Sequence, residues 1–204
     1  MNGWISALFG LIGVTLGAAL TYLREYVTQQ KREKKDAAYL AVVVAGALDR
    51  FSAECVRVVA DDGLSRGQRD ESGFLSAQVK TPTFQPEPLG VDWKSVPADL
   101  MYPILDLPYR IEMANRKIHD TAEYQAEPPD YDEFFEDRQF EYAVLGLDAS
   151  ALATKLRRHV GFPDRPTSQW DPLAYMADVK SKIEEAREER ARRHASGLGV
   201  PALS

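Results

Sequence analysis

The sequence predicts an all-α protein, in which an N-terminal transmembrane helix is followed by an antiparallel four-helix bundle with one long irregular loop. Three observations support this fold class: an uncharged apolar run at the N-terminus, later segments in which apolar residues recur every three or four positions, and Pro, Gly and capping residues between those segments. The composition, 45% apolar and 27% charged, excludes a disordered chain, a collagen-like fibre and a multi-pass membrane protein.

The apolar run extends over 20 residues from Trp4 to Leu23 and contains no charged side chain. A helix of this length measures about 30 Å, which is the thickness of the hydrocarbon core of a bilayer. A cleaved signal peptide is the alternative, but it would carry its basic residues before the apolar run, and here they follow it. We therefore expect residues 1–23 to form a transmembrane anchor in contact with the lipid bilayer.

The net charge of −6 is distributed unevenly along the chain. Residues 24–35 carry five Lys/Arg against two Glu, whereas residues 36–204 carry 20 Lys/Arg against 29 Asp/Glu. Because basic residues flanking a membrane helix favour the cytoplasmic side, we expect the N-terminus outside and the C-terminal domain in the cytoplasm. These residues also suit anionic lipid headgroups. The basic side chains of this juxtamembrane helix are Arg24, Lys31, Arg32, Lys34 and Lys35.

Small residues line one face of the predicted membrane helix, and two of them have the GxxxG spacing. Such a face lets a second helix approach closely, so it predicts a homo-oligomer formed through the membrane helix. Glycine is also common in membrane helices for other reasons, and that alternative stays open. The candidate packing residues are Gly10, Gly13, Gly17 and Thr21.

Residues 36–194 are expected to form the helical bundle. The first helix, over residues 36–61, has a core-facing apolar stripe, and it either continues the membrane helix as one rod or is separate from it. Residues 62–96 are rich in Gly and Pro and predict a long loop, which is either a binding loop or simply mobile. Within this loop, the weak alternation in residues 74–80 is consistent with a short strand.

A second helix is predicted to extend to Tyr124, with Ser95 as its capping residue and Pro97 in its first turn. Pro103 and Pro108 lie inside this segment, and we expect them to kink or split the helix.

Two further helices have clear boundaries. Asp130 and Glu133 have the spacing of an N-cap and its capping-box partner, and Gly161 is placed to end the helix that they begin. Asp171 followed by Pro172 predicts the start of the last helix. Residues 195–204 are expected to be a disordered tail.

No catalytic, cofactor-binding or metal-ligating constellation is evident in the sequence. The three histidines, His119, His159 and His194, lack partners at ligand spacing, and His159 is expected to complement a helix C-terminus. Cys55 is the single cysteine and lies in an apolar stripe, so we expect it to behave as a small hydrophobic residue. The sequence has no phosphate-binding glycine loop, and an acidic domain argues against a nucleic-acid partner.

The densest charge in the chain is an acidic cluster early in the third bundle helix. Negative charge is favoured there by the helix dipole, which is the simplest reading, and a surface for an unidentified basic protein partner is the alternative. The candidate partner residues are Asp130, Asp132, Glu133, Glu136 and Asp137.

Several short stretches resemble uncharacterised bacterial single-pass proteins with an N-terminal anchor and a helical cytoplasmic part. These stretches are Val91–Lys94, Ala98–Tyr102, Leu107–Pro108, Arg110–Glu112, Pro128–Tyr131, Leu145–Leu147 and Trp170–Pro172. The resemblance implies a location in the bacterial inner membrane, and it carries no activity and no site residues.

We expect an inner-membrane-anchored, non-enzymatic scaffold or interaction module that acts at the cytoplasmic face. Two other classes stay open: a phage-type lysis or envelope accessory protein, and a membrane-bound hydrolase or metal-binding protein. The missing site chemistry favours the first class.

Overall fold

The computed structural model describes residues 3–165 and 170–197, and within the first helix it describes the side chains of residues 16–18 and from residue 20 onward. This described part contains four α-helices and no β-strand, so the all-α prediction is confirmed. The helices are α1 (Gly3–Val59), α2 (Ala98–Tyr124), α3 (Asp132–His159) and α4 (Pro172–Gly197). Two short 3₁₀ turns, η1 (Glu87–Leu89) and η2 (Trp93–Ser95), precede α2.

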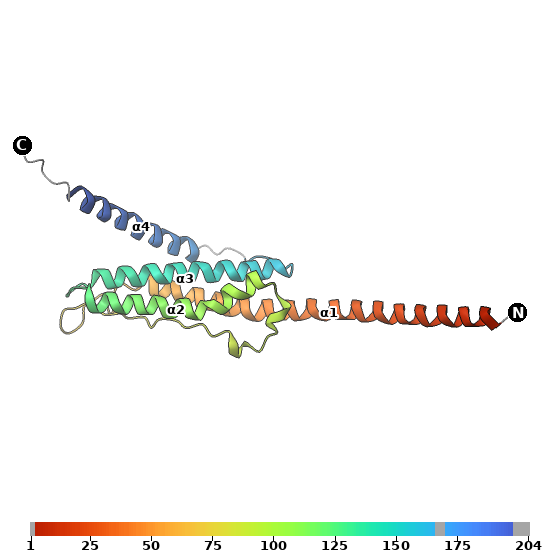
Figure 1. Cartoon of the computed structure of the whole chain (residues 1–204). Coiled ribbons are helices and arrows are strands. Elements are labelled where there is room, and N and C mark those ends of the chain that lie inside the picture. The colour runs from red at the N-terminus through yellow and green to blue at the C-terminus, as the bar shows by residue number, and fades with distance from the viewer. Residues whose placement is uncertain (1–2, 166–169, 198–204) are drawn as a thin grey trace, which may run out of the picture.

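Helix α1 is one continuous rod, which settles the open question of whether residues 36–61 form a separate helix. Its C-terminal part packs into the bundle from Ala37 onward, whereas its N-terminal part projects away from the other helices (Figure 1). Residues 20–36 are exposed.

Among the described residues, no helix combines the length and the apolar composition needed to cross a membrane. The predicted anchor, Trp4–Leu23, falls largely on residues 4–15, whose side chains lie outside the described part. The anchor therefore stays a prediction.

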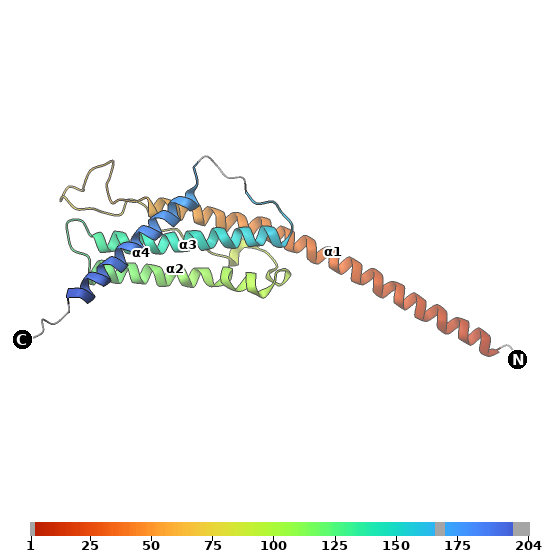
Figure 2. The ribbon, with the colours of Figure 1, turned by 90° about the horizontal axis from the view of Figure 1, so that it is seen from above.

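Helix α3 occupies the centre of the bundle and packs against α1, α2 and α4 (Figures 1 and 2). It runs antiparallel to each of them, while α1, α2 and α4 run in the same general direction. The parallel arrangement of α1 and α2 differs from the simple antiparallel order that we expected. The reason lies in residues 60–97, which run back along the length of the bundle, so that α2 starts at the end from which α1 projects.

Helix α4 is a peripheral element and not an equal member of a four-helix bundle. It crosses α3 obliquely and diverges from it toward the C-terminus (Figures 1 and 2). Among its described side chains only Met176 and Ile183 are buried, whereas ten residues of α3 are. The helix continues to Gly197, so the predicted disordered tail begins too early; residues 198–204 lie outside the described part.

The long loop is confirmed as irregular, and it packs on the bundle through Phe84, whose ring lies 6.1 Å from that of Phe51. The short strand considered for residues 74–80 is wrong. The backbone N–H groups of Gln78 and Val79 donate to the Asp61 carboxylate, each at 2.9 Å, so a side chain takes the place of a neighbouring strand.

The predicted start of α2 is wrong in detail, because Ser95 donates its hydroxyl to the backbone of Asp92 and does not cap the helix. The helix also remains unsplit across Pro103 and Pro108. Each proline removes one backbone hydrogen bond, but Ile104 and Leu107 are fully buried beside them and hold this stretch on the bundle.

The capping box predicted for α3 does not form. Tyr131 adopts a left-handed conformation, with φ of 53°, and the helix begins after it. The Asp130 carboxylate accepts a hydrogen bond from Arg69 of the long loop instead. The other boundaries are confirmed, since Gly161 has φ of 77° and Asp171 accepts from the backbone N–H groups of residues 173 and 174.

Candidate functional site

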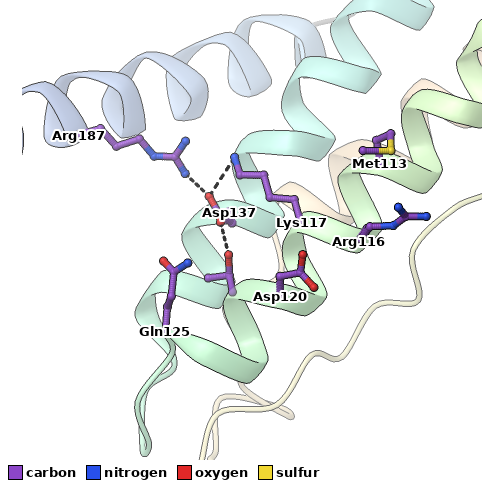
Figure 3. Close-up of a pocket in the computed structure, with 8 residues that line it drawn as sticks. Met113, Arg116, Lys117, Asp120, Gln125, Asp137 and Arg187 are labelled. Atoms are coloured by element: carbon purple, nitrogen blue, oxygen red, sulfur yellow. Dashed lines mark hydrogen bonds and ion pairs between the residues drawn. The ribbon is translucent and has the colours of Figure 1, made fainter.

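A polar site that joins three helices lies where α2, α3 and α4 meet, around the carboxylate of Asp137 (Figure 3). Asp137 accepts hydrogen bonds from the Thr121 hydroxyl at 2.6 Å and from Arg187 at 2.5 Å, and Lys117 Nζ lies 3.5 Å away. One carboxylate from α3 therefore connects α2 to α4. The surrounding cavity of about 550 Å³ is lined by Met113, Arg116, Lys117, Asp120, Thr121, Gln125, Asp137 and Arg187.

Glu136 extends this ionic network along α4. Its carboxylate accepts from Arg187 at 2.8 Å and binds Arg190 through both oxygens, at 2.6 and 2.7 Å. Burial raises the pKa of Glu136, but the hydrogen bonds from Arg190 and Arg187 outweigh it and hold this pKa below its usual value. The site thus favours the charged form of the acid.

The aromatic ring of Phe140 lies one helical turn further along α3 and is surrounded by cations. The Arg187 guanidinium is 4.5 Å from the ring centroid, and the ammonium groups of Lys117 and Lys180 are at 5.8 and 5.9 Å. Cations at such distances are attracted to the negative face of the ring. Phe140 therefore joins the acids in holding the basic side of α4.

Gly146 lies where α1 and α4 approach α3 closely. A Cβ atom on this glycine would lie 2.8 Å from both the Cβ of Cys55 and the Sδ of Met176. The Ser52 hydroxyl also donates to the Gly146 carbonyl at 2.8 Å. Because glycine has no side chain, Met176 can fill the space above it. We call the surface formed by Glu136, Asp137, Phe140, Gly146 and Cys55 the α4-docking surface.

The acidic residues predicted as a partner surface are divided by the fold. Glu136 and Asp137 pair with α4, and Asp130 pairs with Arg69. Asp132 and Glu133 are exposed at the start of α3. The strongest ionic partners of this cluster therefore lie within the chain itself.

A second cavity, of about 410 Å³, lies between α1, the C-terminal part of α3 and the start of α4. At its wall the nearly buried Asp49 accepts from Arg157 and also pairs with Arg165 at 3.0 Å. Ser150 and Thr154 line the same cavity.

The candidate residues for chemistry are kept apart by the fold. His119, His159 and His194 are exposed, and His119 pairs with Glu123 on its own helix. Cys55 is fully buried, and burial raises the pKa of its thiol well above the usual range. In the part of the chain that the structure describes, no group of three or more His, Cys, Asp or Glu could hold a metal ion.

The projecting segment of α1 places the predicted basic residues in the open. Arg24, Lys31, Arg32, Lys34 and Lys35 are all exposed, and none forms an ion pair with a described residue. A Cβ built on Gly17 would meet no atom within 4 Å apart from its chain neighbours and the backbone of its own helix, and Thr21 donates to the Gly17 carbonyl at 3.0 Å. The surroundings of Gly10 and Gly13 lie outside the described part.

Sequence reasoning missed the buried ion pair between Asp61 and Arg138, whose side chains are only 1% and 3% exposed. Arg138 Nη1 donates to Asp61 at 2.7 Å, and its Nη2 donates to the Val79 carbonyl. Burial raises the pKa of Asp61, but the hydrogen bonds from Val79, Gly63 and Arg138 outweigh it and keep this pKa below its usual value. The sequence does contain an indication of this pair: Arg138 lies three residues after Phe135 and four before Tyr142, on the helix face that carries the apolar residues.

No protein-family model, no curated protein and no solved structure matches this chain.

Proposed function

We propose that this chain is a membrane-anchored, non-enzymatic scaffold or interaction module that holds a helical domain at the cytoplasmic face of a bacterial inner membrane. The observation that carries the proposal is the continuity of α1, which joins the apolar segment Trp4–Leu23 to the core of the bundle without a break. Among the described side chains of the projecting segment, Leu16, Leu20 and Leu23 are all more than half exposed. A lipid environment would bury them.

The basic segment fits the same arrangement. Residues 24–36 follow the apolar run and span about 20 Å as a helix before the bundle begins. The net positive charge of residues 24–35, five Lys/Arg against two Glu, suits a cytoplasmic membrane surface, whose anionic lipids attract Lys and Arg. The acidic bundle would then stand clear of the acidic headgroups, separated from them by the rod.

Membrane fractionation of the full chain tests the anchor. We expect the protein to stay with the membrane pellet after alkaline carbonate extraction, and a chain with Ile12→Arg and Leu16→Arg to move to the supernatant, because two charges near the bilayer centre are costly to insert. A matched control places the same charges outside the apolar run, with Val27→Arg and Gln30→Arg. Release of the wild-type chain by carbonate would refute the proposal.

Orientation is a separate measurement. A C-terminal reporter that is active only in the cytoplasm should be active, and one that needs the periplasm should be inactive. The opposite pattern would leave the anchor in place but reverse its predicted side.

A further inference from the structure

Helix α4 is attached to the rest of the bundle by fewer buried side chains than α3. Among its described side chains only Met176 and Ile183 are buried. Tyr175 and Val179 are partly buried against the core, Lys180 lies over the Phe140 ring, and Arg187 and Arg190 pair with the acids of α3. Ion pairs of this partly exposed kind contribute little stability each and weaken with salt. A helix held in this way can leave its surface without unfolding the core.

The α4-docking surface nevertheless recognises a definite pattern. Counting from Met176, the buried Ile183 falls 7 positions later and the ion-paired Arg187 and Arg190 fall 11 and 14 positions later, which is one face of a helix. Met176 packs over Gly146, where there is no side chain. The two arginines pair with Glu136 and Asp137, which precede Gly146 on α3 by ten and nine positions. The surface thus selects an antiparallel helix whose apolar part comes first and whose basic part follows.

The sequence on either side of α4 allows this helix to reach another molecule. Twelve residues, 160–171, separate α3 from α4, and a chain of that length can span about 40 Å when extended. If two copies are anchored in the same membrane with their rods parallel, their docking surfaces lie at the same height. Tethering also raises the effective concentration of one copy's α4 around the other's surface.

We propose that α4 exchanges between two copies of this chain, so that the α4 of each copy docks on the α3 surface of the other. The pattern that the surface selects is supplied by a second copy without any new contact, which is why exchange of an identical element is a low-cost route to a dimer. This inference rests on the proposed function as an interaction module and names its partner, a second copy.

Complementary charge reversal tests the exchange in the detergent-solubilised full chain. One variant, the arm variant, carries Arg187→Glu and Arg190→Glu; the other, the surface variant, carries Glu136→Arg and Asp137→Asn, where asparagine keeps an acceptor for Thr121. Each variant alone places like charges between its own α4 and its own surface. When the two are mixed, both mismatches are relieved only if the helices exchange.

We expect the mixture to form a 1:1 dimer, measured by light scattering, at a level at least tenfold above that of either variant alone. A chain carrying all four substitutions is the matched control, and it should again protect α4 from trypsin as the wild type does. A mixture that stays monomeric overturns the proposal, and so does an equal dimer fraction in the mixture and in each variant, because that result reports association elsewhere. A four-substitution chain that leaves α4 unprotected overturns it as well.

Failure of the anchor would give a different result. A chain that is not a membrane protein would remain in solution without detergent, and the mixing experiment would still report exchange or its absence. The two proposals can therefore fail separately.

Discussion

Helices α3 and α4 are of similar length, yet they are held in the molecule by different forces. Helix α3 is buried on several sides between α1, α2 and α4, and its stripe contains Leu145, Leu152 and Leu156. Helix α4 contributes two buried apolar side chains and a row of arginines. Apolar burial is insensitive to salt and ion pairs at the surface are not, so the two helices should respond differently to the same perturbations.

The two helices also differ in how far their arginine ion pairs are buried. Arg138 of α3 is enclosed and has both an acid and a backbone carbonyl as partners, whereas Arg190 of α4 is half exposed. Enclosed charges are costly to separate because one would be left unpaired away from water. We therefore expect the Arg138 pair to belong to the core, and the Arg190 pair to open and close.

The largest effect should follow loss of the enclosed arginine. Arg138→Leu leaves Asp61 buried without its cation, and we expect the free energy of unfolding to fall by about 3–5 kcal/mol, the usual cost of breaking such a pair. Urea denaturation followed by circular dichroism measures it. As a control, Arg116→Ala removes an exposed pair with Glu112 and should cost less than about 0.5 kcal/mol. Equal losses would show that Arg138 is not part of the core.

Acid should remove part of the same stabilisation. Because the folded state keeps the pKa of Asp61 below its usual value, the ionised carboxylate stabilises the fold fully above about pH 4, and that contribution is lost as the pH falls through the folded-state pKa. The urea midpoint of the wild type should therefore decline below pH 4 more steeply than that of Asp61→Asn. Parallel declines would mean that other carboxylates carry the acid sensitivity.

An intermediate effect is expected where α4 crosses α3. Gly146→Ala adds a Cβ atom against Cys55 and Met176 and should cost about 1–3 kcal/mol through overpacking. The Met176 side chain can move, so α4 should become more sensitive to trypsin before the core unfolds. Gly46→Ala is the matched control, because its Cβ atom would meet only the end of Arg50 at 3.8 Å and should leave stability unchanged or higher. A stable, protease-resistant Gly146→Ala protein would contradict the close contact.

The smallest effect concerns the charges of α4 alone. Arg187→Gln should lower the free energy of unfolding by no more than about 1 kcal/mol, since the guanidinium is about one-third exposed. It should nevertheless increase tryptic cleavage within α4, and raising the salt concentration to about 1 M should do the same to the wild type, because the Debye length falls to about 3 Å. If the rate of tryptic cleavage does not change with salt, α4 is held mainly by apolar contacts, as α3 is.

The sequence was sufficient to predict most of the helices, because apolar spacing and Gly or Pro boundaries are local signals. Gly161 and Asp171 ended and began helices as expected. Asp130 did not, because Arg69, 61 positions away, competes for its carboxylate. Local capping rules cannot anticipate a partner so distant in sequence.

The candidate site was only partly predictable for a similar reason. Glu136 and Asp137 stood out as charge, but their partners on α4 depend on how α4 crosses α3. The glycine at that crossing, Gly146, gave no signal, since its role depends on Cys55 and Met176 from two other helices. The parallel order of α1 and α2 was likewise hidden, because it depends on the path of residues 60–97.

The unbroken α1 also has a mechanical consequence. A helix without a Gly or Pro hinge between residues 18 and 45 transmits rotation about its axis as well as displacement along it. Inserting or deleting one residue in the rod would rotate the bundle by about 100° about the helix axis and shift it by about 1.5 Å relative to the N-terminal segment. The length of the rod therefore sets the direction in which the α4 side of the bundle faces around the axis of α1. A rotation of the N-terminal segment about this axis would turn that side by the same angle.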